Sequence, residues 1–272
     1  MVSKNNTCRI EKTFKGLKAK KKSALITFIT AGDPDFDTSK KILLGLPKAG
    51  ADLIEIGVPF SDPMADGPVI QKSYKRALKK GMTLEKVLSL VKIFRKKNDH
   101  TPIILMGYFN PIFQKGFKKF LYLAKEVGVD GILIVDLPPE NDNEIQENLM
   151  NSDIKLIRLA TPTTNRKRLR KILRNSSGFL YYVSITGITG TNLSNLASVK
   201  GIYNNIKRYS KIPVVVGFGI NSPSKAKEVS RYADGVVVGS SIVNVIDNNM
   251  EHKTKISDNV LSLVRHFSIE MK

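Results

Sequence analysis

The sequence predicts an α/β fold: a single (β/α)8 barrel with an extra helix in front of it. Short apolar, β-branched runs alternate with segments of helical spacing, and this unit occurs eight times within about 240 residues, a usual size for such a barrel. The runs are nearly continuous in apolar residues, which indicates strands buried on both faces of a parallel sheet. No change of composition and no long linker divides the chain. We therefore expect one domain over 1–272, with the barrel at roughly 22–268.

The first repeat illustrates the evidence for each unit. The run 25–32 is apolar and β-branched, and it ends at the turn signal Gly32-Asp33-Pro34. The segment 35–48 then has apolar residues at helical spacing and ends near Gly50. A short basic helix is predicted in front of this repeat, at 8–17.

The same reasoning, in chain order, predicts the remaining elements. Strands are predicted at 51–60, 102–107, 131–138, 154–161, 178–185, 212–219 and 235–239. Helices are predicted at 69–80, 84–97, 117–127, 141–150, 166–174, 199–209, 223–232 and 255–267. Eight strands, each followed by helix, favour the closed TIM barrel, and an open doubly wound sheet is the alternative.

The composition is that of a soluble globular protein. Hydrophobic residues make up 42% of the chain and charged residues 25%. No apolar run approaches the ~18 residues of a membrane span, and the first twenty residues hold no secretory signal. The single cysteine, Cys8, permits no disulfide within the chain, which suits a reducing compartment. We expect a cytoplasmic protein without a membrane partner.

The net charge of +20 is unusual. It could indicate binding to nucleic acid or to an anionic membrane. The basic residues are, however, scattered over predicted helices and helix ends, and both Lys and Asn are abundant. We interpret the charge as a solvated surface and expect no nucleic-acid partner. Attraction of an anionic phosphate substrate is a third interpretation.

Glycines gather where a barrel would hold a phosphate, which is often after strands seven and eight. The seventh predicted strand ends at Gly217-Phe218-Gly219, the eighth at Gly239-Ser240-Ser241, and the loop after the sixth contains 187–190. Glycine lets backbone N–H groups approach an anion, and a helix start adds its dipole. These loops predict a phosphorylated ligand.

Glu55 is the most unusual residue in a predicted strand, because burying its charge is costly unless the charge is compensated. Side chains alternate along a strand, so Glu55 shares a face with Leu53 and Gly57, while Ile54 and Ile56 lie on the other. If the β-branched face meets the helices, Glu55 points into the barrel mouth, where it could act as acid or base. A paired structural glutamate is the alternative.

Three aspartates near strand ends are weaker candidates. Asp66, in Ala65-Asp66-Gly67-Pro68, could be catalytic, but the local pattern slightly favours a turn or an N-cap. Asp62 is expected to form a turn or to contact a partner. Asp136 ends the fourth predicted strand, and the sequence leaves open which way its face points.

Metal and Schiff-base chemistry are not expected. The histidines lie away from the strand ends, no Cys/His cluster exists, and Lys155 lies at the start of its predicted strand, the wrong end for catalysis. Carboxylates beside a phosphate site favour proton transfer without a cofactor, as in an isomerisation or an aldol-type cleavage.

The stretch 55–68, Glu-Ile-Gly-Val-Pro-Phe-Ser-Asp-Pro-Met-Ala-Asp-Gly-Pro, resembles the signature of tryptophan synthase alpha chains. Shorter matching pieces follow in family order at 30–34, 106–111, 135–138, 186–190 and 217–220. The resemblance implies a carbon–carbon lyase that splits indole-3-glycerol phosphate into indole and glyceraldehyde 3-phosphate.

The resemblance also implies roles for single residues. Glu55 would handle the proton at indole C3 and at the glycerol hydroxyl, and Asp66 would bond the indole N–H and stabilise the cationic tautomer. Thr189 would bond Asp66. Other side chains would line the indole pocket, namely Phe28, Tyr108 and Tyr181. The phosphate would be held by Gly190, Gly219, Gly239 and Ser240.

The family works as an α2β2 tetramer, in which indole passes to a beta chain whose pyridoxal phosphate joins it to serine to form L-tryptophan. The resemblance therefore implies a beta-chain partner and no cofactor in this chain. The loop around Asp62 and the loop 187–199 would close the site and touch the partner, with Pro59 and Pro138 near that interface. Two residues depart from the family pattern: Ile185 stands where several members have arginine, and Met106 where leucine is common.

Other functions remain open at this point. A different phosphosugar barrel, such as an isomerase or epimerase, would need no indole pocket. A non-enzymatic chain could be a basic barrel that binds nucleic acid, or an inactive activator of a beta chain.

Overall fold

The computed structural model of the chain describes residues 8–140, 143–150, 152–184, 196–217 and 219–272. Its strands form one closed parallel barrel in chain order, and the closure pairs Ala24 with Gly235. The predicted (β/α)8 barrel is confirmed, and the open sheet is wrong. The strands are β1 (Ala24–Thr30), β2 (Leu53–Gly57), β3 (Ile103–Gly107), β4 (Gly131–Ile134), β5 (Lys155–Ala160), β6 (Leu180–Val183), β7 (Val214–Gly217) and β8 (Gly235–Val238).

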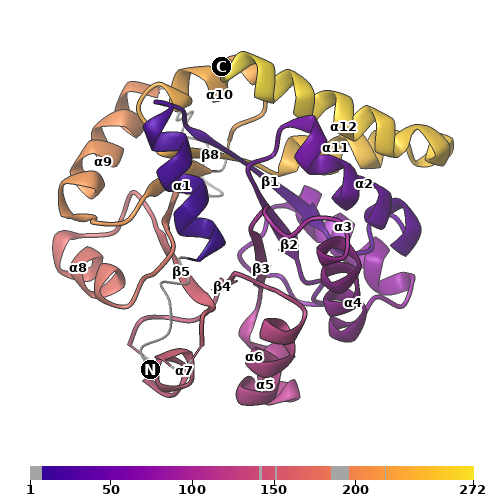
Figure 1. The fold of residues 1–272 in the computed structure, drawn as a ribbon, viewed down its shortest axis with the longest axis horizontal. Coiled ribbons are helices and arrows are strands. Elements are labelled where there is room, and N and C mark those ends of the chain that lie inside the picture. The colour runs from indigo at the N-terminus through magenta and orange to yellow at the C-terminus, as the bar shows by residue number, and fades with distance from the viewer. Residues whose placement is uncertain (1–7, 141–142, 151, 185–195, 218) are drawn as a thin grey trace.

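Helices surround the barrel, and α1 lies across one of its ends (Figure 1). The predicted helices are found as α1 (Arg9–Ala19), α2 (Phe36–Ala49), α3 (Pro68–Lys79), α4 (Leu84–Arg95), α6 (Phe117–Glu126), α7 (Asn143–Met150), α8 (Arg166–Arg174), α9 (Leu196–Tyr209), α10 (Pro223–Ser230) and α12 (Lys253–Glu270). Three helices were not predicted: α5 (Phe109–Lys115), α11 (Ser240–Asn248) and the 3-10 turn η1 (Met250–His252).

The apolar residues form two cores that show which strand face points inward. The inner core fills the barrel and includes Leu53 and Leu133, closed at one end by Phe14 of α1. The outer core lies between strands and helices and includes Ile54 and Ile132. Glu55 shares the face of Leu53, so the structure confirms that it points into the barrel.

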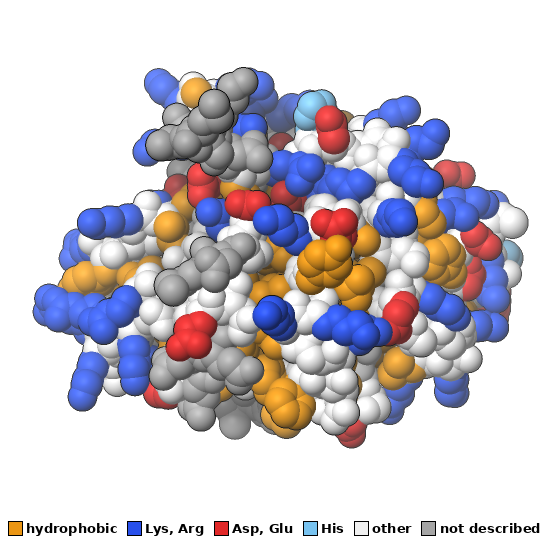
Figure 2. All heavy atoms as spheres, turned by 60° about the horizontal axis from the view of Figure 1, so that its bottom comes forward, with side chains coloured by type: hydrophobic (Ala, Val, Ile, Leu, Met, Phe, Trp, Pro, Cys, Tyr) orange, Lys and Arg blue, Asp and Glu red, His pale blue; other side chains and the backbone are white. Residues whose placement is uncertain are grey.

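The surface is strongly basic. On the face drawn in Figure 2, Lys and Arg side chains are spread over the whole outline, with hydrophobic side chains exposed between them. This spread agrees with the interpretation of the charge as a solvated surface. Within the described part of the chain, no helix has both the length and the apolar character that a membrane crossing needs.

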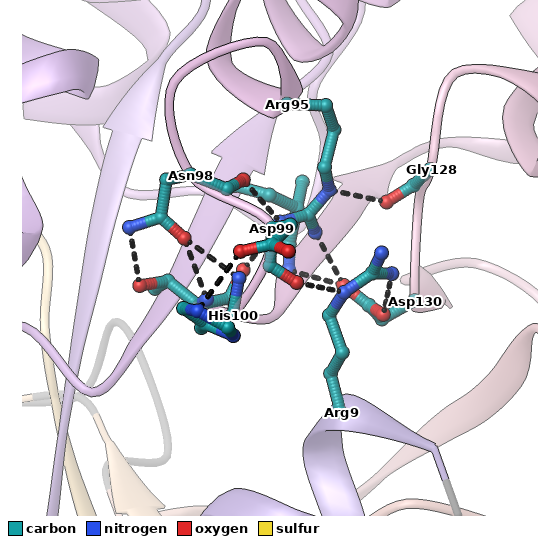
Figure 3. Close-up of polar contacts among 9 residues, drawn as sticks. Arg9, Arg95, Asn98, Asp99, His100, Gly128 and Asp130 are labelled. Atoms are coloured by element: carbon teal, nitrogen blue, oxygen red, sulfur yellow. Dashed lines mark hydrogen bonds and ion pairs between the residues drawn. The ribbon is translucent and has the colours of Figure 1, made fainter. Parts of the chain in front are cut away.

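A buried ionic network attaches α1 to the barrel (Figure 3). Asp130, at the start of β4, accepts hydrogen bonds from Arg9 (Nη1–Oδ1, 2.9 Å), from Arg95 (Nη2–Oδ2, 2.6 Å) and from the backbone N–H of Ile103 (2.8 Å). The Arg95 guanidinium also donates to the carbonyls of Gly128 and Thr101. The Asp130 carboxylate at its centre is buried, the Arg95 side chain is 10% exposed and that of Arg9 is 36% exposed. The network joins α1, α4 and two strands at the end opposite the strand C-termini.

Candidate active site

A cavity opens at the C-terminal ends of the strands. Seven of the predicted site residues line it: Phe28, Glu55, Asp66, Tyr181, Gly219, Gly239 and Ser240. Four further lining residues are not among the predicted site residues: Ile70, Met106, Ile220 and Val237. The lining is therefore mainly apolar, with two carboxylates and a Gly/Ser edge. Of the remaining predicted residues, Tyr108 lies beside Asp66, while Thr189, Gly190 and Ile185 lie outside the described residues.

Glu55 sits on β2 between Phe28 of β1 and Ile104 of β3, and it is fully buried. Neither of its carboxylate oxygens has a hydrogen-bond partner among the described residues. Burial raises its pKa to about 8 from the ordinary value of 4.5. Pairing with a described residue is thus excluded, and the carboxyl group holds its proton at neutral pH. A protonated acid beside an apolar cavity is suited to general acid–base chemistry.

Asp66 is held by a tyrosine and does not cap a helix. Its Oδ2 accepts a hydrogen bond of 2.7 Å from the Tyr108 hydroxyl, which itself accepts one from the backbone N–H of Ala65 (3.1 Å). The N-cap of α3 is Gly67, so the N-cap interpretation of Asp66 is wrong. Burial raises the pKa of Asp66, while the Tyr108 hydrogen bond acts to lower it. Asp66 and Glu55 both line the cavity.

Tyr108 and Tyr181 have different positions, although the resemblance placed both in the indole pocket. Tyr181 lies on the inner face of β6 and lines the cavity, and its pKa is raised by burial and by the charges of Glu55 and Asp66. Tyr108 is buried against Phe60, with ring centroids 5.3 Å apart, and reaches Asp66 with its hydroxyl. In the described structure, Tyr108 thus positions a carboxylate and is not part of the cavity wall.

The Gly/Ser edge of the cavity is the start of a helix. Gly239 is the N-cap of α11 and Ser240 its first residue, so the unpaired N–H groups and the positive dipole end of α11 lie at the cavity. Gly219 follows β7 with φ +76°, a left-handed conformation that favours glycine. This arrangement is suited to an anionic group such as a phosphate.

An ionic network holds α11 against α3. Arg76 of α3 binds both oxygens of the buried Asp33 (2.7 and 2.9 Å) and also contacts Asp247 of α11. Because α3 begins two residues after Asp66, this network links the carboxylate end of the cavity to its anion end.

The other aspartates lie outside the cavity. Asp62 is exposed and bonds Ser61. Asp136 is also exposed and accepts a hydrogen bond from the backbone N–H of Phe109 (2.8 Å), so it caps α5. Among the described residues there is no cluster of three or more His, Cys, Asp or Glu that could hold a metal ion.

Comparisons with known proteins agree on one family. The family model described as tryptophan synthase alpha chain matches residues 14–272. The alpha subunit from Legionella pneumophila str. Paris is 40% identical, with a TM-score of 0.91 over 97% of this chain and 98% of that chain. The alpha chain from L. pneumophila subsp. pneumophila is 39% identical, with a TM-score of 0.90 over 97% of each chain. A tryptophan synthase structure from M. tuberculosis, in an aminoacrylate-bound form, is 27% identical, with a TM-score of 0.86 over 98% and 100%.

Proposed function

This chain belongs to the tryptophan synthase alpha chain family, and from that premise we propose which of its residues carry out the family's reaction. The chain is a lyase: it cleaves indole-3-glycerol phosphate by a retro-aldol reaction, and the indole passes to a beta subunit for tryptophan synthesis.

Glu55 is the acid–base residue. It gives its proton to indole C3 and takes the proton of the glycerol hydroxyl, so that the carbon–carbon bond breaks. The observation that carries this assignment is a fully buried carboxyl group at the cavity whose pKa is about 8 and whose oxygens have no partner among the described residues. Its proton is therefore present at neutral pH and available to a substrate.

Asp66 stabilises the positive charge that develops on the ring. Protonation at C3 makes the ring an electron sink, and a carboxylate at the ring N–H stabilises the resulting cation. The hydrogen bond from Tyr108 supports this role, because it stabilises the ionised form of Asp66. Phe28 and Tyr181 enclose the ring, and we keep Thr189 as a hydrogen-bond partner of Asp66.

The phosphate lies at the start of α11. Gly219, Gly239 and Ser240 offer backbone N–H groups there, and Gly190 completes this set in the proposal. The glycerol chain then lies along the cavity, between Glu55 and this edge.

A beta chain is the partner, and we propose an α2β2 assembly. Exposed apolar side chains follow β2 and β3 in the chain and offer surface for it: Met64, in the loop after β2, is 81% exposed, and Phe113 of α5 is 61% exposed. Asp62, Pro59, Pro138 and the loop 187–199 are the proposed contacts. The pyridoxal phosphate lies in that partner, and this chain holds no cofactor. We further propose a single barrel domain over 1–272 that works in the cytoplasm, without nucleic-acid or membrane partners.

Glu55→Gln tests the assignment. The variant keeps the shape of the side chain but cannot exchange a proton, so indole release from indole-3-glycerol phosphate should fall by at least about a thousandfold. Release is measured with the purified chain alone and with a beta-type partner, and circular dichroism verifies folding. Asp136→Asn is the matched control, because it removes an exposed carboxylate at another strand end and should keep full activity. Near-normal turnover in a folded Glu55→Gln variant would contradict the proposal.

A further inference from the structure

Tyr74 is a buried tyrosine whose hydroxyl lies next to the cavity. It belongs to α3, the helix that begins two residues after Asp66, and its side chain is fully buried in the inner core. A Cβ on Gly57, at the end of β2, would lie 3.1 Å from the Tyr74 hydroxyl oxygen and 2.5 Å from the ring tip of Phe28. Glycine at this position thus gives both side chains room beside the cavity.

The Tyr74 hydroxyl has no hydrogen-bond partner among the described residues. A buried hydroxyl without a partner lowers the stability of a protein, and phenylalanine would fill the same space without that cost. A group of this kind in a native protein requires an explanation, and a role in function is one.

The neighbouring groups identify its partner. Ile70 lies one turn before Tyr74 on the same face of α3 and lines the cavity together with Asp66, so Tyr74 faces the side of the barrel that holds Asp66. In agreement with this, the pKa of Tyr74 is raised first by burial and then by the charges of Asp66 and Tyr108. Tyr108 already donates to Oδ2 of Asp66. A carboxylate can accept about four hydrogen bonds, so Asp66 can accept one from the ring N–H of a substrate and another from a second phenol.

We propose that Tyr74 is a positioning residue for Asp66: when the carboxylate turns to the ring N–H, Tyr74 donates a hydrogen bond to it and, together with Tyr108, holds it ionised and oriented. This inference rests on the proposed role of Asp66. The ring is most positive in the transition state, where the carboxylate matters most. Tyr74 therefore acts mainly on kcat, while the phosphate edge of the cavity determines most of KM.

The test is Tyr74→Phe in the full-length chain, assayed for indole release with and without a beta-type partner. We expect kcat to fall about 10- to 100-fold, the value of one hydrogen bond to a charged group, with KM within about twofold. We also expect Tm to stay unchanged or to rise, because a buried hydroxyl without a partner is removed. Loss of activity without loss of stability is a result that a packing role for the hydroxyl would not give.

Tyr182→Phe is the matched control. Tyr182 is also fully buried and its hydroxyl also lacks a partner among the described residues, but it faces the outer core, away from the cavity. Removal of the Tyr182 hydroxyl should leave Tm unchanged or raise it, as in Tyr74→Phe, and should leave kcat unchanged. An equal fall of kcat in both variants would overturn the inference, because the effect would then belong to any buried hydroxyl of the barrel.

Asp66→Asn separates the two proposals. If this variant loses activity while Tyr74→Phe keeps the native kcat, the role of Tyr74 is overturned and that of Asp66 is supported. If Asp66→Asn keeps full activity, the proposed role of Asp66 fails, and the inference on Tyr74 fails with it.

Discussion

Glu55 occupies the inner core with no described group to compensate its charge. Its pKa is raised to about 8 from 4.5, so between these values the folded protein holds a proton that the unfolded chain has released. The folded state then binds more protons than the unfolded state, and stability falls as the pH rises through this range. Below the lower value both states are protonated, and Glu55 has no effect.

Glu55→Gln should remove this pH dependence. We expect the variant and the native chain to have similar stability near pH 5, and the variant to be more stable by a few kcal/mol near pH 8, with the difference level above that. Urea unfolding at several pH values measures this difference in stability, with Asp136→Asn as the exposed control. A stability difference that stays constant between these pH values would show that the pKa of Glu55 is not raised.

The direction of a single side chain could be predicted where the alternation along a strand determines it. Alternation along β2 placed Glu55 on the face of Leu53, and the structure confirms the inward direction. The local pattern around Asp66 instead favoured a turn or a cap, because its Tyr108 partner lies 42 positions away and leaves no mark in the neighbouring residues. The same holds for Tyr74, whose position depends on how α3 packs against β1 and α11.

Among the elements, α1 depends on contacts that a helical pattern cannot predict. Its Phe14 packs against Phe179 in the inner core, and Arg9 binds Asp130 (Figure 3). The side chains of Asp130 and Arg95 are 4% and 10% exposed. Removing one partner of a buried pair leaves an uncompensated charge, which costs more than the pair itself contributes.

Asp130→Asn should therefore destabilise the chain by about 3–5 kcal/mol, because Arg95 would remain buried without its carboxylate. Chemical unfolding measures the loss. The comparison is Asp153→Asn, which breaks the exposed Lys125–Asp153 pair (3.1 Å) and should change stability by less than about 0.5 kcal/mol. Equal losses in the two variants would mean that Asp130 contributes no more than a surface charge.

The eight strands could be predicted because each is a short, mainly apolar run, whereas α5 and α11 were not predicted. Both helices start within two residues of a strand end, where a Gly/Ser or aromatic stretch is typical of a loop. For α11 a signal was present, since Ile242, Val243 and Ile246 have the spacing of one buried helix face. Missing α11 meant that the sequence predicted the glycines of the phosphate edge but not the helix dipole behind them.

For the whole molecule, the net charge of +20 arises from 44 Lys and Arg against 24 Asp and Glu. Most of the ion pairs lie at the surface, where each contributes about 0–1 kcal/mol. Basic residues therefore outnumber acidic ones by 20, and on the face drawn in Figure 2 they are spread over the surface. Their mutual repulsion opposes the compact state, and it acts over a range that salt shortens.

Salt should therefore stabilise the fold. Raising NaCl from about 10 mM to about 150 mM shortens the screening length from roughly 30 Å to about 8 Å, which weakens both the surface ion pairs and the repulsion among the cations. Because like charges are in large excess, the loss of repulsion should dominate, and Tm should rise by a few degrees in a thermal scan. KCl should give the same shift, since the effect depends on ionic strength and not on one ion. A fall in Tm would show that the ion pairs outweigh the repulsion, and that the excess lysines are too well solvated to oppose folding.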